Sequence, residues 1–250
     1  MVEADPKRPE RLGKAPIVEA LIDIHVEPGA SSLDQLRPFE DLVRGEFPER
    51  KRVIHWQGNL DLRDEEPRMT APAPEVLGFA FWSADKKRVL QARVNGFSFS
   101  HLAPYDRWSS LRDEARGWWE KFVSVNRPTA VKRYALRFVN RIDLPLPMKD
   151  FADYLRTCPR VAPGLPQGLS GVFMRLVVPF PDASVVITQA IDEAGVTAEK
   201  IPVILDIDVF QSSTVPPAGD ELWARLETLR KIKNDVFFNS LTPTAWRLFE

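Results

Sequence analysis

Residues 131–146 read VKRYALRFVNRIDLPL, and this stretch decides the fold. In a β-strand, successive side chains point to opposite faces. Under that alternation one face is apolar and carries Tyr134, Leu136, Phe138 and Ile142. The other face carries Arg133, Arg137 and Arg141, spaced about 13 Å apart at ~3.3 Å per residue. A long strand with one apolar and one charged face predicts a sheet whose core lies on one side only.

The rest of the chain can be ordered around this strand. We expect further strands at 16–26, 52–60, 76–83, 88–95, 97–102, 172–180, 184–191 and 202–211. Helices are expected after Ser31 or Ser32, at 107–125 and after Asp220, followed by a final turn with Thr242 as N-cap and Pro243 at the first helical position. The apolar stripe of the first helix should be Leu36, Phe39, Leu42, Val43 and Phe47. Strands that follow one another closely, interrupted by helices, predict an α+β fold: a large antiparallel sheet with helices packed on one face. The order of elements nearly repeats, which predicts two topologically similar halves, 16–128 and 129–250, in one compact unit. Residues 1–15 are expected to form a flexible arm.

The helix predicted at 107–125 contains two adjacent tryptophans, Trp118 and Trp119. An amphipathic helix buries one stripe of its surface. We therefore expect one ring to face the core and the other to face away, where it could serve as a contact site. Residues 63–75, RDEEPRMTAPAPE, are expected to be a loop.

Three segments resemble a known group of proteins. They are APIVEALIDI near the start, RYALRFVNRIDLP in the middle and NSLTPTAWRLFE at the end. Together they are similar to a sporadically distributed family of uncharacterised bacterial proteins. The resemblance spans nearly the whole chain, but its motifs are strand and tail signatures, so it implies no activity and no functional residues.

Composition limits the classes of function. Lys+Arg 34 against Asp+Glu 35 gives a formal net charge of -1, whereas general nucleic-acid binding needs an excess of positive charge. The single cysteine, Cys158, excludes a disulfide within the chain, and the N-terminal residues lack the apolar core of a secretory signal. No apolar run is long enough to cross a membrane. We expect a bacterial, cytoplasmic protein without a membrane partner.

The residues that most often carry chemistry form no motif. His25, His55 and His101 are dispersed, without a partner at metal-ligand spacing. The glycine-bearing loop 163–171 matches neither phosphate-binding pattern, and no local motif supplies Cys158 with a base. We therefore expect no metal and no cofactor, and catalytic residues remain unidentified.

The charged strand face is the remaining candidate for a site. Carboxylates alternate with apolar residues on two other predicted strands, so they can lie opposite the arginines. The candidate ligand-binding residues are Arg133, Arg137, Arg141, Glu19, Asp23, Asp206, Asp208, Arg93 and Arg175. One interpretation is a solvated face with ion pairs worth a few tenths of a kcal/mol each. The other is a groove or barrel interior that binds phosphate or carboxylate groups.

Two functions follow from this face. The first is a binding or interaction protein whose partner is a protein or an anionic small molecule. The alternative is a metal-dependent enzyme that acts on a phosphorylated substrate. Acids converging on one point would favour the enzyme, and acids each neutralised by an arginine would favour binding. We also expect Arg137 to be the most enclosed arginine, with Asp23, Asp206 or Asp208 as its partner, because it lies mid-strand.

Overall fold

The computed structural model describes residues 9, 12–27, 32–55, 59–61, 68–70 and 74–250. Its strands are β1 (Ile17–Glu27), β2 (Glu49–His55), β3 (Asn59–Asp61), β4 (Arg68–Thr70), β5 (Glu75–Trp82), β6 (Arg88–Arg93), β7 (Gly96–Leu102), β8 (Ala130–Pro145), β9 (Phe173–Phe180), β10 (Ala183–Ile191) and β11 (Lys200–Gln211). Its helices are α1 (Arg37–Val43), α2 (Trp108–Asn126), α3 (Glu221–Ser240) and α4 (Pro243–Trp246). Short 3-10 turns are η1 (Leu33–Leu36), η2 (Phe151–Asp153), η3 (Glu193–Gly195) and η4 (Arg247–Phe249).

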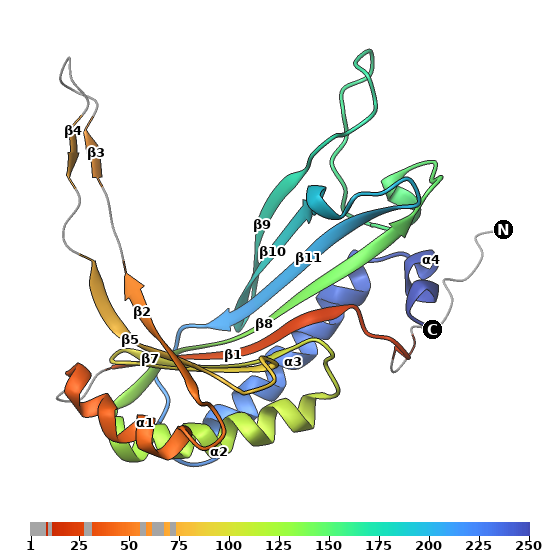
Figure 1. The fold of residues 1–250 in the computed structure, drawn as a ribbon. Helices are drawn as coiled ribbons and strands as arrows, with labels where there is room; N and C mark the ends of the chain where they lie inside the picture. The colour runs from red at the N-terminus through yellow and green to blue at the C-terminus, as the bar shows by residue number, and fades with distance from the viewer. Residues whose placement is uncertain (1–8, 10–11, 28–31, 56–58, 62–67, 71–73) are drawn as a thin grey trace.

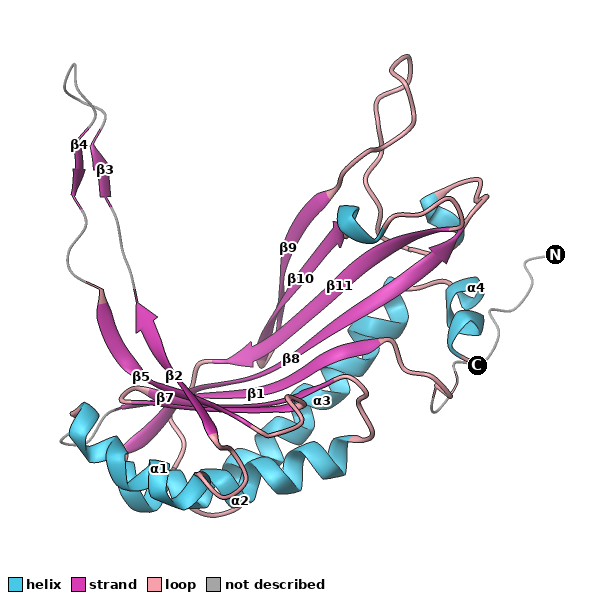
Figure 2. Cartoon of the chain, in the orientation of Figure 1, coloured by secondary structure: helices cyan, strands magenta, loops and turns pink. Residues whose placement is uncertain are grey.

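Nine strands form one antiparallel sheet in the order β2-β5-β6-β7-β1-β8-β11-β10-β9, and β3 and β4 form a separate pair. Helices α1, α2 and α3 lie on one side of this sheet (Figures 1 and 2). The predicted α+β fold, with helices on one face of a large antiparallel sheet, is therefore confirmed. We call the sheet side away from these helices the open face.

The strand order repeats between the two parts of the chain. β1 and β8 are neighbours at the centre of the sheet. From β1 the sheet continues outward through β7, β6, β5 and β2, and from β8 through β11, β10 and β9, in reverse chain order each time. A long helix, α2 or α3, follows the strands of each part. The predicted similarity of the two halves is present in this topology.

The core lies between the sheet and the helices because the central strands alternate as predicted. On β1, Ala20, Ile22 and Ile24 are fully buried, while the residues between them are only partly buried. On β8 the alternate side chains Tyr134, Leu136, Phe138 and Ile142 are buried in the same layer. Burial of such side chains is worth roughly 1.5–3 kcal/mol each, so this layer fixes which face of every central strand is left open.

Both adjacent tryptophans of α2 are buried, so the expectation that one faces away from the core is wrong. Trp119 is 1% exposed and its ring lies 5.7 Å from that of Phe97 on the sheet. Trp118 is 5% exposed because it packs at 5.3 Å against Phe47, which follows α1. Helix α2 thus has packing surfaces on two sides, which a single apolar stripe does not reveal.

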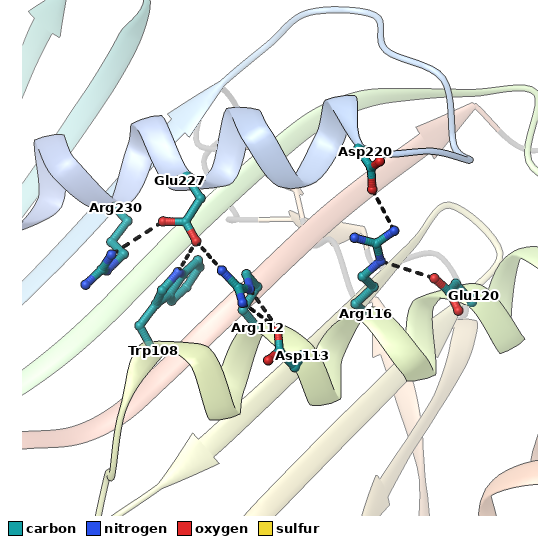
Figure 3. A network of polar contacts seen from close by, with 8 residues as sticks. All are labelled: Trp108, Arg112, Asp113, Arg116, Glu120, Asp220, Glu227 and Arg230. Carbon is teal, nitrogen blue, oxygen red and sulfur yellow. Dashed lines mark hydrogen bonds and ion pairs between the residues drawn. The ribbon is translucent and has the colours of Figure 1, made fainter.

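Ion pairs join α2 to α3 across the helix layer (Figure 3). Glu227 on α3 accepts hydrogen bonds from Trp108 Nε1 at 2.6 Å and from Arg112 Nη1 at 2.8 Å, both on α2. A second contact lies at the beginning of α3: Arg116 Nη2 on α2 lies 2.7 Å from Oδ1 of Asp220, the residue before α3. These contacts fix the position of α3 along the sheet.

Some boundaries differ from those expected. The first helix is short, and Leu42, which we placed on its apolar stripe, is 47% exposed. Part of the expected loop 63–75 lies outside the described residues, and the described part includes β4 and the start of β5. Of the expected arm, only 9 and 12–15 are described, and the Lys14 backbone N–H donates to the Phe249 carbonyl at 2.8 Å. None of the described helices is both long and apolar enough to span a membrane.

Candidate functional site

All nine predicted site residues lie on the open face of the sheet. Glu19 and Asp23 come from β1, Arg133, Arg137 and Arg141 from β8, Asp206 and Asp208 from β11, Arg93 from β6 and Arg175 from β9. Each alternates with helix-facing residues on its own strand, so the period of two places it on this side. We call the eight residues other than Arg175 the charged ladder.

Asp23 is the most connected acid of the ladder. Its Oδ1 accepts a hydrogen bond from Arg93 Nη2 at 2.6 Å, and its Oδ2 one from Arg133 Nη1 at 3.1 Å. His25 Nε2 lies 2.9 Å from the same Oδ2. Asp23 is paired across the sheet with Ser98 and Ala135, whose small side chains leave room for these long neighbours.

Arg133 connects this cluster to the late strand. Its Nη2 lies 3.4 Å from Asp208 Oδ2, and its guanidinium carbon is 4.4 Å from the ring centroid of Phe210. The guanidinium therefore joins acids of β1 and β11 across β8 and stacks on an aromatic ring of the open face. Sequence reasoning did not single out Phe210, although it follows Asp206 and Asp208 at the next alternate position of β11, which places all three on one face.

Arg137 makes the strongest single pair. Its Nε lies 3.0 Å from each carboxylate oxygen of Asp206, and its Nη2 lies 2.6 Å from Oδ2. One of the three expected partners is therefore the observed one. The expected enclosure is wrong: the Arg137 side chain is 49% exposed, against 16% for Arg93 and 26% for Arg133. None of the described elements forms a second layer over this part of the open face, so a central position in the sheet does not cover the side chain.

The far end of the ladder uses residues that sequence reasoning missed. Arg141 Nη1 lies 2.9 Å from Asp192 Oδ2, and its Nε lies 3.3 Å from Asp143 Oδ1. Asp192 immediately precedes η3, in the connection between β10 and β11. A side chain at Gly195 would collide with the Arg141 guanidinium, so the glycine makes this pair possible. No pattern in the sequence placed a connecting loop beside Arg141.

Two acids of the ladder have pKa values that are shifted in opposite directions. Burial raises the pKa of Asp23, but the hydrogen bond from His25 and the charge of Arg93 outweigh it, so the pKa lies below its usual value. Burial also raises the pKa of Asp208, and there the attraction of Arg133 and Arg137 does not compensate, so the pKa lies above its usual value. Of these two acids, Asp208 is thus the one whose ionised form its surroundings disfavour.

Two predicted residues contribute less. The Glu19 side chain makes no hydrogen bond with a described residue, and it acts on Arg137 through its charge. Arg175 is exposed on the edge strand β9, opposite Thr188 of β10, and forms no ion pair with any described residue. The ladder therefore occupies the centre of the sheet and does not reach this edge.

The described residues contain no group of three or more His, Cys, Asp and Glu side chains arranged to hold a metal ion. Asp23, Asp206 and Asp208 each contact an arginine, at 2.6, 2.6 and 3.4 Å respectively. Three of the four acids to which the criterion stated above applies therefore contact an arginine, and the Glu19 side chain forms no ion pair with a described residue. Chemically, the charged ladder offers guanidinium N–H donors that can receive an acidic group.

No protein-family model matches the chain, and no curated protein is similar enough to count as a match. The resemblance to a sporadically distributed bacterial family therefore stays a prediction.

Proposed function

We propose that this chain is a bacterial cytoplasmic binding protein that receives an acidic side chain of a protein partner on its open face. One observation carries the proposal. Arg137 binds Asp206 through Nε and Nη2, so the two N–H groups of its Nη1 have no acceptor among the described residues. The side chain is 49% exposed, so these donors are accessible from above the face.

The balance of charge on this face supports a protein partner. Arg93, Arg133, Arg137 and Arg141 are accompanied by Glu19, Asp23, Asp206, Asp208, Asp143 and Asp192. Arg175 and Lys200 also lie on this face, so a phosphate backbone would meet no excess of cations over carboxylates there, and nucleic acid is disfavoured. Mixed charges in a fixed pattern instead give specificity between proteins, because each group must meet its opposite.

Affinity capture with the immobilised protein tests this proposal. We expect a bacterial lysate to yield a partner that Arg137→Met does not retain, because methionine keeps the apolar stem but removes the donors. Arg225→Met on α3 is the matched control, since Arg225 has a similar exposure, 48%, and one acidic partner, Glu221. A glutamate-rich peptide in excess should displace the partner. Capture that is equal with Arg137→Met and with the unchanged protein would refute the proposal.

A further inference from the structure

A second candidate site lies on the opposite side of the sheet, within the helix layer. A cavity of about 360 Å³ lies between the beginning of α2, the second half of α3 and the strands β1 and β8. Residues of its wall used below are Tyr105, Trp108, Phe138, Asn140, Arg230 and Lys233. Its volume is within the range of about 300–1,000 Å³ typical of small-molecule sites. It shares no residue with the charged ladder.

Aromatic rings form much of the wall, and cations lie against them. The rings of Tyr105 and Phe138 are 5.7 Å apart and nearly perpendicular. Lys233 Nζ lies 4.1 Å from the ring centroid of Phe138, and Arg230 Cζ lies 5.8 Å from that of Trp108. The two cations are three residues apart on α3 and so project from the same side of the helix. A flat apolar body with a negative group matches these walls.

Arg230 keeps donors for a ligand. Its contact with Glu227 Oε2 is long, 3.4 Å, whereas Trp108 at 2.6 Å and Arg112 at 2.8 Å both donate to the other oxygen, Oε1 (Figure 3). Helix α2 also begins beside the cavity with no acidic residue in its first turn and no side-chain cap. Asp106 also lines the cavity, but the cations Arg107, Arg230 and Lys233 outnumber it, so the local field favours an anion over a cation.

Asn140 adds a specific requirement. Its side chain is 1% exposed, and its Nδ2 donates to the carbonyl oxygens of Phe138 at 3.2 Å and Leu205 at 2.9 Å. Its Oδ1 makes no hydrogen bond with any described residue, although Asn140 lines the cavity. This oxygen is not fully enclosed: it opens onto the cavity as a hydrogen-bond acceptor. A ligand hydroxyl can donate to it there.

We propose that this cavity binds a small hydroxy-substituted aromatic carboxylate, with the carboxylate at Arg230, the ring against Trp108 and Phe138, and the hydroxyl at Asn140. The assignment is independent of the function proposed for the open face.

Calorimetric titration with 4-hydroxybenzoate tests it. We expect one binding site per chain. Benzoate, which lacks the hydroxyl donor, and methyl 4-hydroxybenzoate, which lacks the charge, should each bind about tenfold more weakly or worse. No binding of 4-hydroxybenzoate at millimolar concentration, or equal binding of all three compounds, would overturn the proposal.

Two variants locate the site on the molecule. Arg230→Gln should weaken 4-hydroxybenzoate binding at least tenfold, and it leaves Glu227 bonded to α2, so the fold should persist. Arg225→Gln, on the same helix but outside the cavity wall, should leave the affinity unchanged. Unchanged affinity in Arg230→Gln, or an equal loss in both variants, would contradict the placement. Should Arg230→Gln fail to fold, Trp108→Phe provides the same comparison, because it removes part of the stacking surface.

Discussion

Breaking the Arg137–Asp206 pair should cost different amounts from its two sides. The Asp206 side chain is 14% exposed, whereas that of Arg137 is 49% exposed. Arg137→Met removes every hydrogen bond that this carboxylate receives from Arg137 and leaves it enclosed. Asp206→Asn instead leaves a guanidinium that water can reach. Removing the arginine should therefore destabilise the fold more than removing the acid.

The magnitudes follow from these exposures. An enclosed polar group that loses its partner costs roughly 1–3 kcal/mol, so we expect about 2 kcal/mol for Arg137→Met. A guanidinium that water can reach gains only roughly 0.2–1 kcal/mol from its acidic partner, so Asp206→Asn should cost less than about 1 kcal/mol. Urea unfolding followed by circular dichroism measures both. With a slope of about 3 kcal/mol per molar urea, the midpoints should fall by about 0.7 M and by less than about 0.3 M.

The double variant decides whether this reasoning is correct. When both residues are replaced, no carboxylate is left enclosed without a partner, so its stability should lie close to that of Asp206→Asn alone. A double variant whose loss equals the sum of the two single losses would refute the argument. So would an Asp206→Asn protein that is as unstable as Arg137→Met.

Three further predictions concern other parts of the sheet. Asp23→Asn should destabilise the fold at neutral pH, because the pKa of Asp23 is lower in the folded protein than its ordinary value of 3.8. The stability that Asp23 contributes is present above pH 3.8 and is lost as the pH falls through the folded-state pKa. The pKa of Asp208 is raised instead, so Asp208→Asn should be neutral or stabilising at neutral pH. Equal effects in thermal melts from pH 7 to pH 2 would contradict this. Gly78→Ala should cost about 2 kcal/mol or more in the same urea assay, because its Cβ would collide with the backbone of β6. Gly195→Ala should cost less than Gly78→Ala, because its Cβ meets the side chains of Arg141 and Pro202 rather than backbone atoms. Val177 is 56% exposed on the edge strand β9, and a charge at such an edge blocks pairing between the sheets of two molecules. Val177→Lys should therefore reduce concentration-dependent light scattering. Unchanged scattering would show that this edge does not self-associate.

The strands and their faces could be predicted because a period of two is a local property. Arg133, Arg137 and Arg141 alternate with buried residues on β8, and this alone places them on one side of any sheet. The same reasoning placed Asp206 and Asp208 of β11 on that face. The end of the chain was also locally readable: Thr242 Oγ1 accepts from the Ala245 N–H at 3.3 Å, and Pro243 begins α4.

The partners of these side chains could not be predicted, because they depend on the register between strands far apart in sequence. Arg137 is paired across the sheet with Asp208, yet its guanidinium binds Asp206, one alternate position further along β11. Arg141 forms an ion pair with Asp192, which lies in the connection between β10 and β11.

Burial, too, was decided only by the tertiary structure. Trp118 is covered because Phe47 packs on it from another segment. Arg137 is half exposed because no described element covers it on the open face. The cavity at Asn140 exists only where α2, α3, β1 and β8 meet. Sequence periodicity therefore determined which side of each strand carries charge, whereas long-range packing determined which charges meet and which remain accessible to a partner.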